Sequence, residues 1–324
     1  MPALAAVPFQ PAPWRSAIIA ASPAMLALLD QVERIAPSQV PVLLAGETGV
    51  GKDVLARALH EASGRSGRFV ALNCAALPAS LAETELFGHV RGAFTGADRS
   101  CDGLIAQAHN GTLLLDEIGE LPLDVQPKLL RVIEDGVVRR VGSTSLTTVD
   151  VRLICATNRD LRAAVAAGAF RADLYHRVAG VALHVPPLRD RPDDIEPLVE
   201  HFLREFCAGR PVPRLADGTL AVLRNRPWLG NARELRQAVQ RAVLLGGAIL
   251  TSADFTADDT ISRACEPSAD WLYGRCWHDI EHDVLAWAVH RYGNARQAAI
   301  ALGIPRSTFV DRMRKRGVAL RTNP

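Results

Sequence analysis

Residues 40–52 read Val40-Pro-Val-Leu-Leu-Ala-Gly-Glu-Thr-Gly-Val-Gly-Lys52, an apolar run that leads directly into a glycine-rich loop. Such a run is typical of a strand that is buried on both faces. After the loop, apolar residues recur at helical spacing between positions 54 and 59. Strand, G-x-x-x-x-G-K loop and helix in this order predict a P-loop, whose backbone N–H groups and lysine bind phosphate groups. The residues expected to bind nucleotide are Gly46, Glu47, Thr48, Gly49, Val50, Gly51, Lys52 and Asp53.

Two acidic residues end a later apolar strand, Thr112-Leu-Leu-Leu-Asp-Glu117. In P-loop ATPases an acid at a strand end holds Mg²⁺, and a neighbouring acid polarises the attacking water. We therefore assign Asp116 to the metal and Glu117 to the water. A strand end that is simply solvated gives the same pattern, but the P-loop upstream favours the catalytic interpretation. Asp53 stands where the P-loop pattern has Ser or Thr, so the hydroxyl group that usually binds Mg²⁺ is missing.

Two more predicted strands end in polar residues. The stretch 69–73 ends on Asn73, and the stretch 149–156 is followed by Thr157 and Asn158. Alternating strands and helices predict an α/β fold with a doubly wound parallel sheet, which binds its ligand at the carboxyl ends of the strands. We therefore expect one edge of the sheet to collect Lys52, Asn73, Asp116, Glu117 and Asn158.

A loop of small residues, Gly92-Ala-Phe-Thr-Gly-Ala97, lies between the P-loop and the acidic strand. Its only large side chains are Phe94 and Thr95, and its glycines add backbone freedom. One interpretation is an ordinary glycine turn with Phe94 in the core, because phenylalanine is most often buried. The motifs on either side favour the other interpretation, a mobile effector loop.

The rest of the chain divides by composition. We expect a Pro- and Ala-rich tail at 1–20, an α/β subdomain at 21–188, a helical lid at 189–250, a linker at 251–275 and a helical module at 276–324. The net charge of the chain is only +2, but from Arg291 onward eight basic residues face one acidic residue. This asymmetry is typical of a nucleic-acid-binding module.

Two short helices around Leu302-Gly-Ile304 predict a helix-turn-helix in this module. We expect its second helix to contact the major groove of double-stranded DNA near its start and phosphates near its end. A small basic helical bundle that binds protein is the alternative. The expected DNA contacts are Arg306, Ser307, Thr308, Arg312, Arg314, Lys315 and Arg316.

Several classes of protein are disfavoured. The six cysteines include no C-x-x-C pair, so neither a disulfide framework nor a zinc ribbon is expected. The chain has no apolar run of membrane-spanning length and no charged start of a signal peptide, which predicts a cytoplasmic protein without membrane contact. His278-Asp-Ile-Glu-His282 fits a zinc-protease pattern but has no evident third ligand, so we interpret it as a polar helix face.

Together these motifs resemble the sigma-54-dependent transcriptional activators of the AAA+ ATPase superfamily, from about Ser22 to Gly317. Residues 92–97 match the GAFTGA loop of that family without substitution, and residues 85–89 also fit. Val90 replaces an acid that is often found at that position, and Leu229 replaces a usual proline. An acidic residue after the lysine is usual in this family, so Asp53 does not argue against activity.

The resemblance implies roles for single residues. Residues 46–52 and 116–117 resemble Walker A and Walker B, with ATP and Mg²⁺ as cofactors. Asn73 is similar to a switch asparagine that pairs with Glu117, and residues 157–158 are similar to sensor I. Arg233 is similar to sensor II, and residues 142–149 to a second surface loop. The expected arginine fingers, which act on the nucleotide of a neighbouring subunit, are Arg171 and Arg177.

The resemblance also implies partners and a mechanism. Subunits would form a ring, expected to be a hexamer, and ATP hydrolysis would remodel sigma-54 RNA polymerase holoenzyme at promoters while the C-terminal module binds DNA upstream. Only about twenty residues precede the ATPase, which suggests control in trans, by a separate protein or through expression level. A DNA-remodelling AAA+ motor and a DNA-binding regulator with a vestigial ATPase are the alternatives. The expected sigma-54 contacts are Gly92, Ala93, Phe94, Thr95, Gly96 and Ala97.

Overall fold

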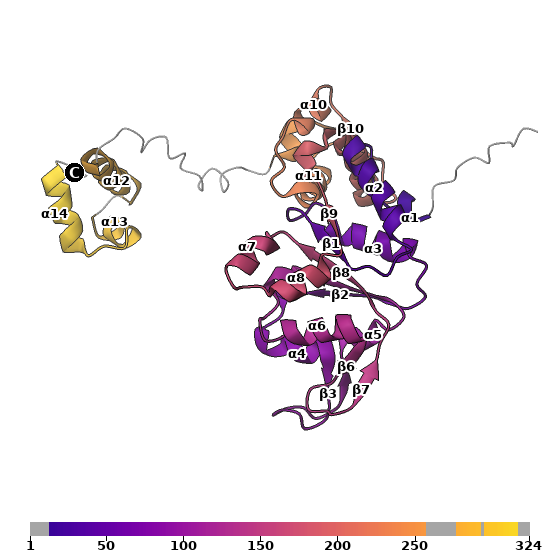
Figure 1. Cartoon of the computed structure of the whole chain (residues 1–324). Coiled ribbons are helices and arrows are strands. Elements are labelled where there is room, and N and C mark those ends of the chain that lie inside the picture. The colour runs from indigo at the N-terminus through magenta and orange to yellow at the C-terminus, as the bar shows by residue number, and fades with distance from the viewer. Residues whose placement is uncertain (1–12, 257–276, 293–294, 317–324) are drawn as a thin grey trace, which may run out of the picture. The chain divides into compact units, whose positions relative to one another are not determined.

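The computed structural model describes residues 13–256, 277–292 and 295–316 (Figure 1). The chain forms two compact units, residues 1–257 and residues 258–324, and each is described by itself. The first unit contains an α/β subdomain and a helical lid. The second is a small helical unit.

A five-stranded sheet organises the α/β subdomain, with the strand order β2-β5-β8-β1-β9. All neighbouring strands in this sheet run parallel, which confirms the predicted doubly wound parallel sheet. Because the strands are parallel, their carboxyl ends meet at one edge. The strands are β1 (Val42–Ala45), β2 (Phe69–Asn73), β5 (Thr112–Asp116), β8 (Arg152–Thr157) and β9 (Val181–His184).

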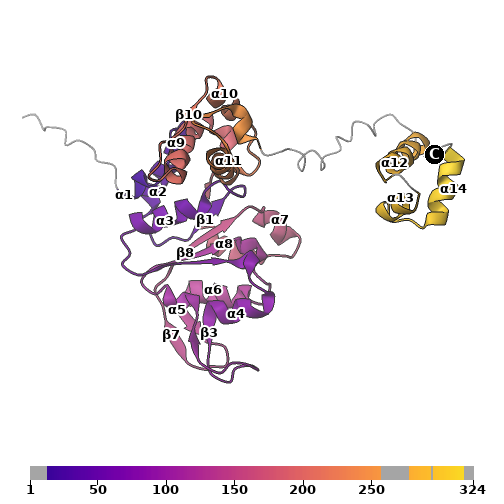
Figure 2. The ribbon, with the colours of Figure 1, turned by 180° about the vertical axis from the view of Figure 1, so that it is seen from behind.

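Both faces of the sheet are covered, because successive side chains of a strand point to opposite faces. Leu43, Leu113 and Leu115 belong to one apolar cluster, whereas Leu44 and Leu114 belong to the other. The first cluster packs against α4 (Ala79–Phe87), α5 (Leu104–Gln107), α6 (Gln126–Asp135), α7 (Leu161–Ala166) and α8 (Ala172–Val178). The second packs against α1 (Pro13–Ser16), α2 (Pro23–Ile35) and α3 (Lys52–Ala62), which lie together in Figure 2.

The N-terminal segment differs from the predicted tail. Residues 13–20 belong to the folded unit: α1 forms over Pro13–Ser16, and Trp14 is only 6% exposed in the apolar core. Ile18 and Ile19 pack against the core clusters as well. Prolines mask any periodicity here, so the sequence pattern does not reveal that these three side chains bury apolar surface. Residues 1–12 lie outside the described part.

The lid consists of α9 (Ile195–Phe206), α10 (Thr219–Arg224), α11 (Asn231–Leu245) and the short strands β10 (Arg214–Leu215) and β11 (Ile249–Leu250), which confirms the predicted helical lid. Its core includes Trp228 and Phe255, both almost fully buried. A 3-10 turn at Ser252–Phe255 carries Phe255 into that core. The lid therefore continues to residue 256 rather than ending at 250, and the rest of the predicted linker lies outside the described residues.

Two small hairpins project from the α/β subdomain at the end away from the lid (Figure 1). One is formed by β3 (Gly88–His89) and β4 (Cys101–Asp102), and it carries residues 92–97 at its tip. The other is formed by β6 (Val137–Arg139) and β7 (Leu146–Thr148).

The second unit packs α12 (Trp277–Tyr292), α13 (Ala295–Ala301) and α14 (Arg306–Arg316) against one another. Leu285, Ala298, Phe309 and Met313 are buried in its core. Gly303 has a φ of 66° in the turn between α13 and α14, a conformation that favours glycine. Among the described residues of the whole chain, no helix has the length and apolar character needed to cross a bilayer.

Candidate functional site

The P-loop lies at the carboxyl edge of the sheet, between the end of β1 and the start of α3. Lys52 is the first residue of α3 and is only 7% exposed. Its ammonium group donates hydrogen bonds to the carbonyl oxygens of Gly46 and Glu47, at 2.8 and 3.1 Å. Burial lowers the pKa of this ammonium group, although the carboxylates of Glu117 and Asp116 act in the opposite direction. The Lys52 ammonium group thus lies among carbonyl and carboxylate oxygens.

Glu117 lies directly after β5 and faces this lysine. Its Oε1 is 4.0 Å from the Lys52 Nζ, and its Oε2 accepts a hydrogen bond from the Asn158 N–H at 3.1 Å. The backbone of Glu117 is left-handed, with a φ of 51°. This conformation costs roughly 1–2 kcal/mol for a residue with a Cβ atom. Such strain is typical of functional positions, where the surrounding structure holds a side chain in a particular place.

Asn158 connects Glu117 to the P-loop. Its side-chain Nδ2 donates to the Thr48 hydroxyl at 3.0 Å, while its backbone N–H bonds Glu117. The structure therefore brings Lys52, Glu117 and Asn158 together, as expected from strand ends that share one edge. These three side chains come from different strand–loop junctions of the sheet.

Asp116 is suited to a magnesium ion that is bound together with nucleotide. One carboxylate oxygen accepts the N–H of Glu117 at 3.0 Å, and no other hydrogen bond to this side chain is present in the described part of the chain. No group of three or more His, Cys, Asp or Glu side chains could hold a metal among the described residues. A single carboxylate fits Mg²⁺, which keeps several waters and uses substrate phosphates as ligands.

Asn73 does not join this group. Its side-chain oxygen accepts the N–H of Ala75 at 2.9 Å and caps the short 3-10 turn Cys74–Ala76. The predicted contact between Asn73 and Glu117 is therefore absent from this structure, although the two strands β2 and β5 are neighbours. The physical reason is local, because an asparagine side chain readily bonds a backbone N–H two residues ahead.

The lid contributes residues that the sequence did not assign to the site. Asn231 is the first residue of α11, and Gly230 takes the N-cap position. The fully buried Asn231 side chain donates to the Glu47 carboxylate and to the Thr48 carbonyl, both at 3.1 Å. Sequence pattern gives no signal for this role, because the partners lie more than 180 residues away.

Glu47 is also held by Arg189, which forms an ion pair with it at 2.5 Å. Hydrogen bonds from Arg189 and then from Asn231 lower the pKa of the Glu47 carboxyl to about 2. Arg233 of the lid contacts the P-loop, because its backbone N–H donates to the Gly49 carbonyl oxygen at 3.3 Å. The predicted sensor residue Arg233 is thus close to the P-loop, and its charge contributes to the lowered pKa of Lys52 after the larger effect of burial.

A small hydrophobic pocket of about 180 Å³ adjoins the P-loop. Its walls come from the N-terminal segment, the P-loop and the lid, and they include Ile18, Ile19, Val50 and Phe202. An apolar pocket next to a phosphate-binding loop is suited to a flat heteroaromatic base. The sequence did not indicate it, because three of its lining residues, Ala17, Ile18 and Ile19, lie in the predicted tail.

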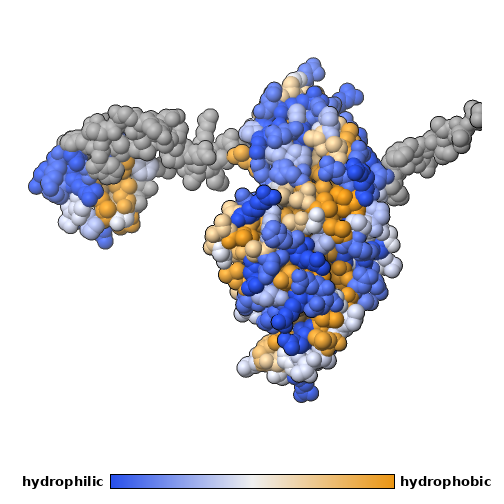
Figure 3. All heavy atoms as spheres, viewed as in Figure 1, coloured by the Kyte–Doolittle hydropathy of each residue, from blue (hydrophilic) through white to orange (hydrophobic). Residues whose placement is uncertain are grey.

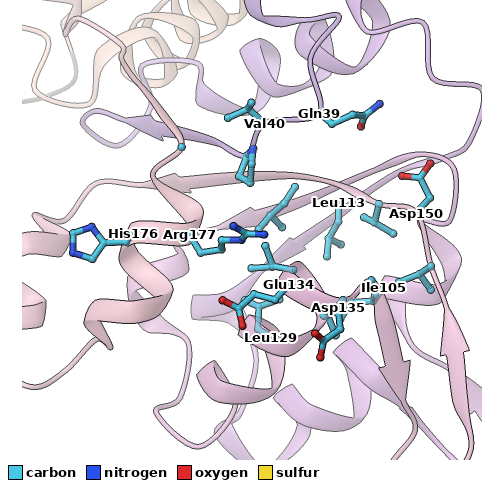
Figure 4. A pocket seen from close by; sticks show the side chains of 18 residues that line it. Gln39, Val40, Ile105, Leu113, Leu129, Glu134, Asp135, Asp150, His176 and Arg177 are labelled. Atoms are coloured by element: carbon cyan, nitrogen blue, oxygen red, sulfur yellow. The ribbon is translucent and has the colours of Figure 1, made fainter.

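The two predicted arginine fingers lie at opposite ends of α8. Arg171 precedes the helix and pairs with Asp173 at 2.7 Å, and its backbone N–H donates to the buried Gln126. Arg177 lines a separate cavity of about 810 Å³ (Figure 4), whose lining includes the residues before β1, β8 and β9. That cavity is at the amino ends of the strands. In the described part of the chain, neither arginine bonds the P-loop of its own subunit.

The loop 92–97 is exposed and supported from below. Phe94 is 42% exposed and contacts the ring of His89 at a centroid distance of 5.1 Å, so it is not the core residue of the alternative interpretation. The Gly92 N–H donates to the Ala97 carbonyl at 2.9 Å, which closes the loop. Val90 bonds the backbone of Val141 in the second hairpin at 3.1 Å. Figure 3 shows hydrophobic and weakly polar residues at this end of the subdomain, with strongly hydrophilic ones at its tip.

In the second unit, some of the side chains predicted to bind DNA form ion pairs with acidic side chains of the same unit. Glu281 of α12 pairs with Arg312 at 3.3 Å and with Arg316 at 2.5 Å, and Lys315 pairs with Asp311 at 3.0 Å. Within the described residues, no ion pair engages Arg306 or Arg314, and both are exposed. His278 belongs to the stretch 278–282 that fits a zinc-protease pattern, and its side chain is not among those that the structure describes.

Comparisons with known proteins agree with this geometry. Residues 18–184 match the sigma-54 interaction domain, and residues 189–268 match the AAA+ ATPase lid domain. The chain is 44% identical to the formate hydrogenlyase transcriptional activator of Salmonella typhimurium over 93% of its own length, but it spans only 44% of that relative. It is also 44% identical to the transcriptional regulatory protein ZraR of the same species, over 91% of this chain and 68% of ZraR.

A solved structure shows the same similarity. NtrX from Brucella abortus, in complex with ADP, is 34% identical, with a TM-score of 0.69 over 93% of this chain and 70% of NtrX. NtrX has also been solved in complex with ATP. The chain therefore belongs to the family of proteins that combine a sigma-54 interaction domain with an AAA+ ATPase lid domain.

Proposed function

We propose that this chain is an ATP-driven transcriptional activator that remodels sigma-54 RNA polymerase holoenzyme. The observation that carries the proposal is the combination, in one subdomain, of the Lys52–Glu117–Asn158 cluster and an exposed loop that presents Phe94 and Thr95. The first feature is suited to hydrolysing a nucleotide, and the second is suited to contacting a protein.

In the proposed reaction, the chain's own groups position the reactants and stabilise charge. Lys52 binds the β- and γ-phosphates, and Arg233 adds positive charge from the lid. Glu117 orients and polarises the attacking water, because its carboxylate lies 4.0 Å from the lysine and is fixed by Asn158. Asp116 would hold Mg²⁺, which neutralises charge on the phosphates when it is bound.

We propose that Arg171 and Arg177 act on the nucleotide of a neighbouring subunit in a ring, for which a hexamer is the expected size. The position of Arg177 supports this, because its cavity is at the opposite edge of the sheet from the P-loop of its own chain. An arginine supplied in this way is typically worth about 10³–10⁵ in rate. To reach that phosphate, the Arg171 guanidinium must leave Asp173. Both side chains are exposed, so water can solvate the Asp173 carboxylate after the ion pair breaks.

The output end of the proposed mechanism is the loop 92–97. Glu117 bonds Asn158 in this structure, and we propose that it exchanges this partner for Asn73 when the γ-phosphate changes. A switch of this kind biases a two-state element, here the hairpin that carries the loop. Phe94 and Thr95 would then engage sigma-54, with the second hairpin bracing the loop through Val90 and Val141.

For the second unit, we propose a helix-turn-helix that binds double-stranded DNA upstream of the promoter. The pair α13 and α14 with its glycine turn supports this proposal. Arg306, Ser307 and Arg314 are the best-placed contacts, because they are exposed and free of ion pairs within the described residues. Arg312 and Arg316 would have to leave Glu281 to reach a phosphate.

Open-complex formation on a sigma-54 promoter tests the function. Wild-type protein with ATP should yield open complexes, and protein with Thr95→Ala should yield none while it still hydrolyses ATP. A wild-type ATPase that is stimulated by DNA and needs no sigma-54 would instead indicate a DNA-remodelling motor. Absence of any ATP hydrolysis would indicate a DNA-binding regulator.

A further inference from the structure

Three successive carbonyl groups of the P-loop accept hydrogen bonds from the lid. The Thr48 oxygen accepts from the Asn231 side chain at 3.1 Å, and the Gly49 oxygen accepts from the Arg233 backbone at 3.3 Å. The Val50 oxygen accepts from the Arg191 guanidinium at 2.7 Å, in a buried bond. The lid therefore holds three consecutive peptide units of the loop that would bind phosphate.

The orientation of those peptide units has a direct consequence. In a trans peptide unit, a carbonyl oxygen and the N–H of the next residue point in opposite directions. Fixing the carbonyls of residues 48–50 toward the lid therefore turns the N–H groups of residues 49–51 away from it. None of these three N–H groups makes a hydrogen bond within the described part of the chain. Successive free N–H groups of this kind form a concave anion site.

The contact between lid and loop is close and fixed. A Cβ atom at Gly49 would overlap the carbonyl oxygen of Gly230. The turn that carries Gly230 is strained on both sides, because Trp228 and Asn231 have φ values of 43° and 54°. Asn231 is fully buried, and its side-chain oxygen accepts the Leu188 N–H at 2.7 Å, which leaves its amide nitrogen aimed at the loop.

We propose that Asn231 is a positioning residue for nucleotide phosphate: together with Arg191 and the Arg233 backbone, it sets the peptide planes of residues 48–51. Lid position and phosphate affinity are then coupled, since moving the lid releases the carbonyls and lets the N–H groups rotate. This inference rests on the proposed nucleotide-binding function and adds the lid as the element that shapes the phosphate site.

The test compares a ligand that has phosphates with one that has none. The full chain with Asn231→Ala, and separately with Asn231→Asp, is titrated with ADP by calorimetry and with adenosine by saturation-transfer NMR. Asn231→Asp keeps the acceptor for Leu188 but removes the donor to Thr48. The matched control is Arg236→Met, which removes a partly exposed lid ion pair with Glu205 and none of the lid's bonds to the P-loop.

We expect both Asn231 variants to bind ADP about tenfold more weakly, with adenosine affinity close to wild type, and the control to bind both ligands normally. The unliganded Tm should fall in both variants, because Asn231 is fully buried and bonds Glu47 at 3.1 Å, so the ratio of ADP affinity to adenosine affinity decides the test. The KM for ATP should rise more than kcat falls. Unchanged ADP affinity, or an equal loss for ADP and adenosine, would overturn the proposal. Wild-type protein that binds neither ADP nor ATP would instead overturn the proposed function itself.

Discussion

The P-loop and the loop 92–97 are both glycine-rich, but they are held in opposite ways. The backbone carbonyl groups of the P-loop accept hydrogen bonds from the lid, and Lys52 is buried, with only 7% of its surface exposed. The loop 92–97 closes on itself and leaves Phe94 42% exposed. The difference indicates that one loop is fixed in shape by its surroundings, while the other is free to meet a partner. The predictions below test this contrast, from the largest expected effect to the smallest.

The largest effect should come from the arginines of α8. Arg171→Ala and Arg177→Ala should each lower kcat for ATP by about 10³–10⁵, as expected for arginines that act across a subunit interface. Steady-state ATPase assays measure this, and circular dichroism of the monomer should be unchanged. Near-normal turnover in both variants would contradict the assignment to the interface.

The next prediction separates hydrolysis from output. Thr95→Ala and Phe94→Ala should leave ATPase activity within about twofold of wild type, because surface substitutions away from the catalytic cluster rarely disturb the fold. Open-complex formation should be lost, since the loop would no longer contact sigma-54. A matched change at Arg99, which is exposed near the same loop but outside residues 92–97, should retain both activities. Loss of hydrolysis in the loop variants would show that the two loops are not independent.

A pair of glycine substitutions compares the surroundings of the two loops. Gly49 and Gly96 have φ values of 81° and 97°, so alanine is strained by roughly 1–2 kcal/mol at either position. At Gly96 an added Cβ meets no atom within 4 Å, whereas at Gly49 it overlaps the Gly230 backbone. Chemical denaturation should therefore show that Gly49→Ala lowers the free energy of unfolding more than Gly96→Ala. An equal loss of unfolding free energy in the two variants would mean that the lid moves away from the added Cβ at Gly49 without a measurable cost in stability.

The smallest effect concerns pH. The pKa of the Glu47 carboxyl is lowered from 4.5 to about 2 by Arg189 and Asn231, so the folded state favours the ionised form. The resulting stabilisation is complete above pH 4.5 and is lost as the pH falls toward 2. Because Glu47 is exposed to solvent, the effect on Tm should be small. Glu47→Gln should remove this part of the acid dependence of Tm, and a profile unchanged from wild type would argue against the shift.

Local sequence patterns predicted those parts of the site that neighbouring residues define. The P-loop spacing, the acidic end of β5 and the polar residue after β8 each occur within a few residues, and parallel pairing brings them together. Contacts across the chain were not predictable in this way. Asn231 bonds Glu47 across 184 positions of the chain, and Ile18 lines the apolar pocket beside the P-loop from a stretch that lacks periodicity. Asn73 shows the reverse case: in this structure its side chain accepts a local backbone N–H, and the expected contact with Glu117 stays a prediction.

One buried carboxylate bears on the order in which this molecule folds. Asp194, with no exposed surface, accepts the N–H groups of Ala21 and Ser22 at 2.6 and 2.7 Å, and it lies 3.5 Å from Arg191. The start of α2 is thus completed by a residue 172 positions further along the chain. A contact between residues so far apart in the sequence forms late in folding, because the entropy of the intervening chain must be lost first. During synthesis, the wall of the apolar pocket beside the P-loop therefore stays unfinished until the first turn of the lid has left the ribosome.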